Sequence, residues 1–270
     1  HSQIEKIHRL KKKKKRIDKR KAVGNKMPSL KQLLSLPERG IISVIGGGGK
    51  TSVIAHLADE FCREGKTVLC TTTTHIAALH PVPPWVVLEE EGQALDFAQI
   101  RKLLTRYRVV TCAKKAQNPQ KFSAPSDQFF AQAETLADIV LIEADGAKHL
   151  PFKAPAEHEP VILAHTKHII GVAGMDAAGV PILQRCHRPE QVCAILGCSS
   201  QDILTPQMMA EVIVSPLGYQ KCVDHSKAFS LVLNKCDTLE RISMAQQILS
   251  SLRLSHASFP VAFTSLHQDK

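Results

Sequence analysis

The sequence has no apolar run approaching the roughly 20 residues that a membrane-spanning helix needs, and no apolar core follows its basic start as in a signal peptide. Its eight cysteines include no C-x-x-C pair and form no dense framework, which favours a reducing compartment over a disulfide-stabilised secreted fold. No internal repeat is visible. We therefore expect a cytoplasmic protein that does not use a membrane.

Most of the chain also lacks net charge. The formal charge of +10 comes from residues 1–26, which hold 12 Lys or Arg and two acids, whereas the remaining 244 residues hold 23 of each. This balance argues against a protein that coats nucleic acid. Residues 1–26 have few apolar side chains and are expected to be disordered or to form a frayed helix. Three interpretations stay open for them: an extension without function that ends before Met27, an arm for nucleic-acid or membrane phosphates, and a regulatory or targeting segment.

After this basic segment, short β-branched runs alternate with helical patterns. The alternation predicts an α/β fold, and the continuous apolar runs predict a mostly parallel sheet covered by helices on both faces, as in P-loop NTPases. We expect a single nucleotide-binding domain over residues 27–270. Strands are predicted at 41–45, 67–71, 108–112, 138–143, 168–174, 229–234 and 260–263, helices at 50–63, 94–105, 126–137, 189–196, 206–214 and 238–252, and long loops at 75–93 and 113–125.

The stretch SVIGGGGKTSV, residues 43–53, lies between a predicted strand and a predicted helix. Consecutive glycines permit positive φ angles and let main-chain amides approach a phosphate, while the following helix directs its positive dipole end at the same anion. The usual pattern G-x-x-x-x-G-K-[ST] would place another glycine at Val44, so the wrap around the phosphates is expected to differ. A flexible glycine turn with an exposed lysine is the alternative. The predicted nucleotide-binding residues are Gly46, Gly47, Gly48, Gly49, Lys50, Thr51 and Ser52.

Acidic residues follow the strand predicted at 138–143. Glu143 ends it and Asp145 and Gly146 come next, in a D-x-x-G-like order with Glu in place of Asp. Such an acid holds Mg²⁺ or its water opposite a triphosphate, and either acid here can polarise a water or a substrate hydroxyl. A turn with two solvated acids is the alternative. We predict Lys50, Glu143 and Asp145 as catalytic residues and Thr51 and Glu143 as ligands of Mg²⁺.

A simple condition applies to this site. If the structure buried Lys50, or directed it away from Glu143, the predicted pocket for a polyphosphate would not exist. Nearby, Lys148 and His149 are either cations for the terminal phosphate or parts of an exposed loop. The segment 157–159, Glu-His-Glu, is expected to be a solvated loop because its spacing matches no recognised metal site.

Further polar residues lie at other predicted strand ends. Thr71–Thr74 are either Mg²⁺-shell hydroxyls or threonines chosen for β propensity. Asn234, Lys235 and Asp237 form N-K-x-D, in which the aspartate accepts hydrogen bonds from the guanine N1–H and 2-amino group. This favours GTP over ATP, although Asp237 and Glu240 also form a helix-capping D-x-x-E pattern. The loop after 168–174 is a candidate second-substrate site, with turn formation and helix entry as alternatives for its residues Asp176, Arg185, His187 and Arg188.

The chain resembles the YqeC family, accessory proteins of selenium-dependent molybdenum hydroxylases, over roughly residues 30–266. The resemblance implies a phosphate-loop nucleotide-binding fold and a place in selenium cofactor biosynthesis, with a molybdenum hydroxylase or a selenium-delivery protein as partner. It carries over 46–51 as the nucleotide loop and 143–148 as the acidic segment. It depends on the motifs GGGGKTS, TTTTHI, EADGAKHLPFKAPAEHEP, GVAGMDAAG, CHRPE and NKCD, in this order.

Together these patterns predict a Mg²⁺-dependent protein that binds GTP or ATP and assists the maturation of such hydroxylases as an NTPase or NTP-dependent enzyme. Two alternatives stay open. One is a GTP-gated chaperone or adaptor whose long loops respond to the nucleotide. The other is a small-molecule kinase or nucleotidyltransferase, for which the sequence identifies no acceptor site.

Overall fold

The computed structural model describes residues 27–79 and 81–266, so the basic segment 1–26 lies outside the described part of the chain. Within that part, a ten-stranded sheet has the order β12-β11-β9-β1-β7-β2-β5-β6-β3, with β4 paired to β5. Its strands are β1 (Gly40–Gly46), β2 (Val68–Thr72), β3 (His75–Ala77), β4 (Val86–Glu89), β5 (Val109–Lys115), β6 (Lys121–Ser123), β7 (Ile139–Glu143), β9 (Thr166–Gly174), β11 (Ala228–Asn234) and β12 (Val261–Phe263).

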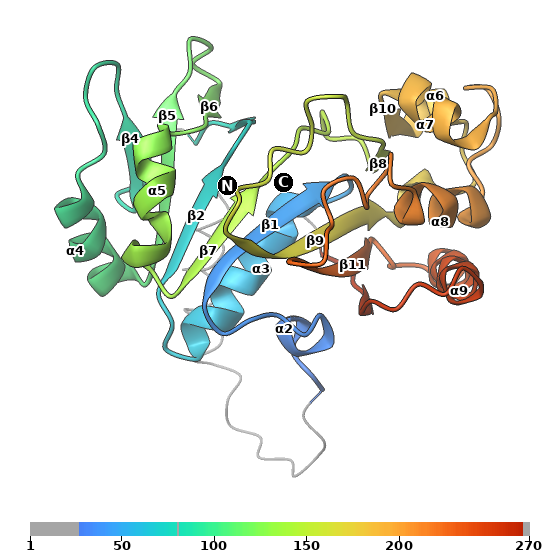
Figure 1. Ribbon diagram of the computed structural model, residues 1–270, viewed down its shortest axis with the longest axis horizontal. Coiled ribbons are helices and arrows are strands. Elements are labelled where there is room, and N and C mark those ends of the chain that lie inside the picture. The colour runs from blue at the N-terminus through green and yellow to red at the C-terminus, as the bar shows by residue number, and fades with distance from the viewer. Residues whose placement is uncertain (1–26, 80, 267–270) are drawn as a thin grey trace.

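Helices connect the strands, and a second, two-stranded parallel sheet pairs β8 (Phe152–Lys153) with β10 (Cys186–His187). Figure 1 shows these short strands, together with neighbouring helices, beyond the carboxyl ends of β1 and β9. The helices are α2 (Leu30–Leu33), α3 (Lys50–Arg63), α4 (Phe97–Tyr107), α5 (Asp127–Leu136), α6 (Ile182–Arg185), α7 (Pro189–Leu196), α8 (Pro206–Val214) and α9 (Leu239–Leu254), with a 3-10 turn, η1 (Met175–Ala177).

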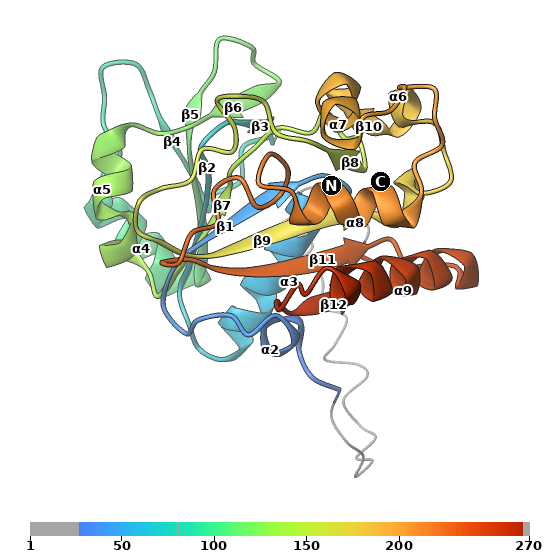
Figure 2. The ribbon, with the colours of Figure 1, turned by 45° about the vertical axis from the view of Figure 1, so that its right-hand side comes forward.

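Apolar cores lie on both faces of the main sheet because successive strand side chains point to opposite sides. In β1, Ile41 and Ile45 join the core formed with α4, α5, α8 and α9, whereas Ile42 and Val44 join the core formed with α2 and α3. Figures 1 and 2 show α3 and α5 on opposite sides of the sheet. The predicted α/β class, with a mostly parallel sheet covered on both faces, is confirmed.

Many predicted element boundaries agree with the structure, and α3, α7 and α8 begin and end at the predicted residues. The two predicted long loops are wrong. Residues 75–93 contain β3 and β4, and residues 113–125 contain the end of β5 and β6. These short strands are selected by their neighbours in the sheet: β4 pairs with β5, and β3 and β6 pair with each other in antiparallel fashion.

The sheet order places the glycine loop at the centre of the molecule. β1 lies between β9 and β7, and β7 in turn lies beside β2. The register opposes Val44 of β1 and Thr72 of β2 to Glu143, so the carboxyl ends of these three strands are adjacent. No helix within residues 27–79 and 81–266 has the length and apolar character that a membrane crossing requires.

Candidate functional site

The glycine loop joins β1 to α3 through an unusual backbone. Gly46, Gly48 and Gly49 have φ angles of 96°, 80° and 126°, a region that residues with a Cβ rarely adopt. α3 begins at Lys50, and its N-cap residue, Gly49, provides no side-chain hydrogen bond. The first N–H groups of this 14-residue helix therefore lack a side-chain cap at the predicted phosphate position.

Close packing is a second reason why glycine is required in this loop, besides the positive φ angles. A Cβ on Gly46 would lie 2.2 Å from the carbonyl oxygen of Val172, and a Cβ on Gly48 would lie 2.3 Å from the main-chain nitrogen of Gly174. The loop is thus pressed against the carboxyl end of β9. These glycines are required by the protein's own backbone, whatever ligand the loop binds.

The expectation of bared glycine amides needs a correction, because three of them already have acceptors within the chain. Their hydrogen bonds hold the loop against β9 and against the segment that follows β7. The bonds run from Gly46 N to Asp145 Oδ2 (2.9 Å), from Gly47 N to Val172 O (2.9 Å) and from Gly48 N to Leu150 O (3.1 Å).

Lys50 is directed at the acids but is not accessible. Its Nζ lies 2.7 Å from Gly46 O, 3.1 Å from Asp145 Oδ1 and 3.7 Å from Glu143 Oε1. The direction agrees with the sequence-based expectation, whereas the burial, with 4% of the residue exposed, contradicts it: in this conformation Lys50 does not line an open polyphosphate pocket. Burial by itself lowers the pKa of Lys50, but the charges of Asp145 and Glu143 outweigh it and raise the pKa above its usual value. The lysine is therefore a charged group held by carboxylates.

Thr51 and Glu143 meet at the position predicted for a metal. The Thr51 hydroxyl donates to Glu143 Oε2 at 2.9 Å. A hydroxyl and a carboxylate are hard oxygen donors of the kind that suits Mg²⁺, which fills its remaining positions with water and phosphate. Within the described residues, no group of three or more His, Cys, Asp or Glu side chains is arranged to hold a metal ion. Ser52 is buried on α3.

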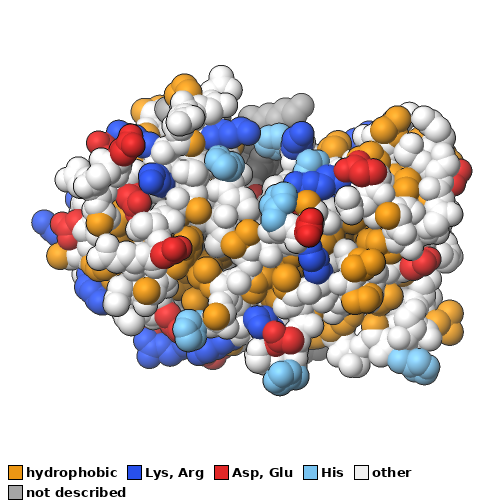
Figure 3. Space-filling model, turned by 45° about the horizontal axis from the view of Figure 1, so that its top comes forward, with side chains coloured by type: hydrophobic (Ala, Val, Ile, Leu, Met, Phe, Trp, Pro, Cys, Tyr) orange, Lys and Arg blue, Asp and Glu red, His pale blue; other side chains and the backbone are white. Residues whose placement is uncertain are grey.

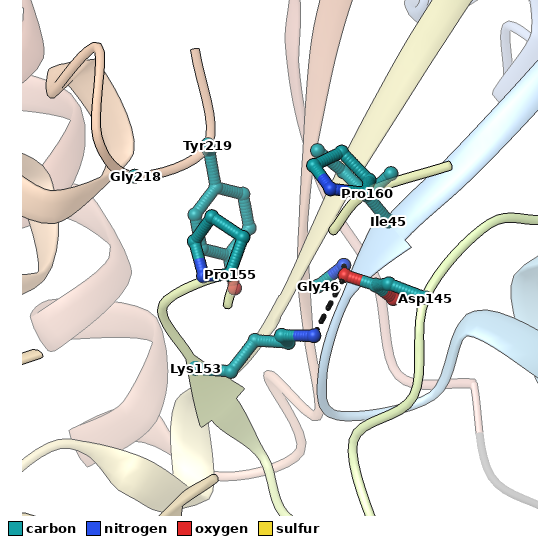
Figure 4. A pocket seen from close by; sticks show the side chains of 8 residues that line it. All are labelled: Ile45, Gly46, Asp145, Lys153, Pro155, Pro160, Gly218 and Tyr219. Atoms are coloured by element: carbon teal, nitrogen blue, oxygen red, sulfur yellow. Dashed lines mark hydrogen bonds and ion pairs between the residues drawn. The ribbon is translucent and has the colours of Figure 1, made fainter. Parts of the chain in front are cut away.

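A chain of buried charges continues from Asp145 to α7. Lys153 Nζ lies 3.1 Å from Asp145 Oδ2 and 2.5 Å from Glu159 Oε2, and Figure 4 shows Lys153 and Asp145 meeting beside Gly46. Arg188 binds both oxygens of Glu159, at 2.6 and 3.1 Å. These ion pairs, together with the Gly46 N–H bond to Asp145 and the pairing of β8 with β10, connect the glycine loop to the segment before α7.

The prediction of a solvated loop at 157–159 is wrong for Glu159, which is 6% exposed. Burial raises the pKa of Glu159, but the hydrogen bonds and charges of Lys153 and Arg188 outweigh it and lower the pKa to about 2. Sequence reasoning did not identify Lys153. The available signal was a single lysine in Phe-Lys-Ala-Pro, an apolar setting in which a lysine needs a buried partner.

The threonines after β2 anchor neighbouring loops. The Thr72 hydroxyl donates to Glu143 O at 2.9 Å, and the Thr73 hydroxyl donates to Val161 O at 2.9 Å. Thr71 is buried with its hydroxyl unbonded among the described residues. These contacts explain why hydroxyl side chains are needed at Thr72 and Thr73 without a metal ion.

Asn234 ties the end of β11 to the glycine loop. Its Nδ2 donates to Gly48 O at 2.8 Å and to Leu266 O at 2.9 Å, while its Oδ1 accepts from the Thr264 hydroxyl and from Leu266 N, both at 2.8 Å. The buried amide is fully used by the protein. Asn234 therefore positions the loop rather than facing an open base site.

The other residues of N-K-x-D have separate partners. Lys235 Nζ binds Asp176 Oδ2 at 2.7 Å, which brings the predicted second-substrate loop next to this motif. Asp237 Oδ1 lies 2.5 Å from Arg241 Nη1 on α9. The proposed capping role of Asp237 is wrong, because Thr238 is the N-cap and accepts from Arg241 N.

Lys148 and His149 are exposed in the segment after Asp145, and both have positive φ angles, of 46° and 62°. The carbonyl of the next residue, Leu150, accepts from Gly48 N, so the pair lies beside the glycine loop. Figure 3 shows Lys, Arg and His side chains gathered near the centre of the face that carries the strand ends. Lys148 therefore presents an exposed positive charge beside the glycine loop, on a face where acidic side chains also lie.

Comparisons with known proteins agree with the resemblance found in the sequence. A model of the family described as YqeC protein matches residues 42–190, more than half of the chain. The chain is 29% identical over 215 residues to the uncharacterized protein YqeC of Escherichia coli strain K12, covering 79% of this chain and 82% of that protein.

A similar solved structure is that of chloroplast FtsY from Physcomitrella patens, with a TM-score of 0.38 and 14% identity. The match covers 92% of this chain and spans 62% of the length of that one. With the family match across the glycine loop, the acidic segment and the Arg188 region, the chain belongs to the YqeC family.

Proposed function

We propose that the protein binds a nucleoside triphosphate together with Mg²⁺ at the β1–α3 loop. The observation that carries the proposal is the uncapped start of α3, whose first two residues, Lys50 and Thr51, both contact Glu143 at the end of the neighbouring strand. Helix dipole, ammonium, hydroxyl and carboxylate thus converge, and each has a defined role toward a polyphosphate.

Lys50, Thr51 and Glu143 have different proposed roles, which follow from the chemistry of their side chains. Lys50, which stays charged, neutralises the phosphate oxygens, and Thr51 and Glu143 hold the metal. Mg²⁺, when bound, supplies positive charge between phosphate groups. Glu143 is also placed to orient a water or an acceptor hydroxyl, the step expected of an NTPase or NTP-dependent enzyme.

We also propose that this nucleotide chemistry serves the maturation of a selenium-dependent molybdenum hydroxylase. Membership of the YqeC family supports this biological role. The glycine loop supports the nucleotide, whereas the hydroxylase rests on the family resemblance. A hydroxylase or a selenium-delivery protein is then the partner to test for nucleotide-dependent binding.

Titration calorimetry of GTP and ATP, with and without Mg²⁺, tests the nucleotide proposal. Lys50→Ala is expected to weaken binding by about a hundredfold, which corresponds to about 2.8 kcal/mol, because an ammonium group is lost from the phosphates. Thr51→Val is expected to keep the fold and to lose most of the Mg²⁺ dependence. Lys102→Ala, on the exposed side of α4, is the matched control for loss of one positive charge.

Circular dichroism and thermal unfolding establish that each variant is folded, since Lys50→Ala leaves two acids near one another. Absence of binding by the folded wild-type protein at millimolar nucleotide would remove the proposal. Equal affinity of wild type and folded Lys50→Ala would place the nucleotide elsewhere.

A further inference from the structure

Asp145 is a buried acid surrounded by donors of the kind that bind a phosphate. Its side chain is 3% exposed, and its Oδ2 accepts the Gly46 N–H at 2.9 Å and lies 3.1 Å from Lys153 Nζ. Its Oδ1 lies 3.1 Å from Lys50 Nζ without the geometry of a hydrogen bond. One glycine-loop amide and two ammonium groups therefore converge on this carboxylate.

Both lysines would keep a partner if Asp145 moved away. Lys50 retains Gly46 O at 2.7 Å and Glu143 at 3.7 Å. Lys153 retains Glu159 at 2.5 Å and Gly146 O at 2.7 Å. Displacement of Asp145 by another anion would thus leave neither buried lysine without an acceptor.

A structural ion pair is the competing explanation. Buried ion pairs add little net stability, because the desolvation of both charges offsets their attraction, and Lys153 already has Glu159. A small cavity beside Asp145 and Lys153, with walls that include Ile45, Pro155 and Tyr219 (Figure 4), has room for about one water molecule, so a phosphate reaches the two lysines only by displacing the Asp145 carboxylate.

We propose that the Asp145 carboxylate occupies a phosphate subsite formed by the Gly46 N–H, Lys50 and Lys153, so that Asp145 and a phosphate group of the ligand compete for it. The proposal rests on the nucleotide function proposed above and adds Lys153 as a phosphate-binding residue. It also reconciles the burial of Lys50 with that function, because a phosphate takes over the contacts that bury the lysine. Asp145 is then a placeholder for the ligand and not a catalytic acid.

Asp145→Asn tests the competition, because the amide keeps the size of the side chain and an oxygen for Gly46 N–H but removes the negative charge. Calorimetry with GTP, ATP and inorganic triphosphate, in EDTA at constant ionic strength, separates phosphate recognition from metal and base. We expect the variant to bind all three at least about tenfold more tightly than wild type. Asp145→Ser is a second neutral variant should the amide fail to fold.

Matched variants identify the source of the effect. Glu134→Gln removes an exposed acid that pairs with Lys167, and no change in affinity is expected from it. Lys153→Gln, introduced into Asp145→Asn, is expected to cancel most of the gain, whereas a merely structural lysine would change the unfolding temperature and leave the affinity of the folded protein unchanged.

The outcomes for this subsite differ from those for the nucleotide function. If wild type binds nucleotide and both neutral Asp145 variants bind equally or more weakly, the subsite proposal is wrong and the nucleotide function stands. If neither wild type nor the neutral variants bind any of the three probes, either in EDTA or with Mg²⁺ present, the nucleotide function itself fails. Binding by the neutral variants alone would support the competition.

Discussion

At the scale of single residues, Asn234 and Asp237 of the N-K-x-D motif differ in burial and in the partners that they bind. Asn234 uses its amide on the main chain at Gly48 and Leu266, so its change affects the whole loop. Asp237 is partly exposed and pairs with Arg241 one helical turn later. Because Asn234 is fully buried and Asp237 is exposed, replacement of Asp237 disturbs the interior less.

On the interpretation of N-K-x-D as a guanine-reading motif, Asp237→Ala is expected to weaken the binding of GTP and to leave ATP affinity unchanged. The stability change should stay within about 1 kcal/mol, because partly exposed ion pairs contribute little. Competition calorimetry gives the ratio of the two dissociation constants. Glu240→Ala, which removes the neighbouring acid in the first turn of α9, is the control, and an unchanged ratio in Asp237→Ala would mean that this aspartate does not read the base.

At the scale of elements, the β1–α3 loop is the most constrained connection of the site. Gly46 and Gly48 combine positive φ angles with contacts to the backbone of β9, so two separate costs oppose a side chain at either position. Gly92, by contrast, has a φ of 74° and no atom within 4 Å of an added Cβ. An alanine at Gly92 would therefore introduce backbone strain alone, whereas an alanine at Gly46 would introduce strain and steric overlap.

Gly46→Ala is expected to lower the free energy of unfolding by roughly 2–4 kcal/mol, as the sum of strain and overpacking. Gly92→Ala should lower it by only about 1 kcal/mol, from strain alone. Urea denaturation followed by circular dichroism measures both. Equal losses in the two variants would contradict the close approach of Gly46 to Val172.

At the scale of the whole molecule, buried polar pairs join the central strands. Ser43 of β1 and Thr166 of β9 share a hydrogen bond of 3.1 Å, and His168 of β9 meets the Ser230 hydroxyl of β11 at 2.8 Å. Burial lowers the pKa of His168 to about 4. The folded sheet therefore holds this imidazole neutral, and its stability is linked to pH.

The direction of this pH dependence follows from the protonation of His168 in the folded and the unfolded chain. As the pH falls from about 6.5 to about 4, the unfolded chain binds a proton at His168 and the folded chain does not, so this contribution is present above pH 6.5 and is lost progressively below it. The slope is at most about 1.4 kcal/mol per pH unit for one group. Urea denaturation between these pH values should show a shallower decline for His168→Gln than for wild type. Exposed His225→Gln is the control, and parallel curves for wild type and His168→Gln would contradict the assignment.

Much of the fold was predictable because its signals are local. The apolar period of α3 and the proline starts of α7 and α8 lie within the helices themselves, and the central strands are continuous apolar runs. The short strands β3, β4 and β6, at one end of the sheet, were missed for the opposite reason. Their pairing depends on neighbours such as β5, so a few residues rich in proline and polar groups carry too little of the signal.

The candidate site likewise has features that local sequence predicts and features that depend on distant contacts. Chain order alone placed a glycine loop, Lys50 and Thr51 after one apolar strand and Glu143 and Asp145 after another, because glycine conformations and strand patterns are properties of short segments. Tertiary structure decided that Lys50 is buried, that Lys153 joins Asp145 and that Asn234 holds the loop. These contacts connect residues as far apart as the 99 positions between Gly46 and Asp145 and the 186 between Asn234 and Gly48. Only the packing of the sheet brings such partners together, because a charge in a sequence does not reveal which distant counter-charge shares its burial.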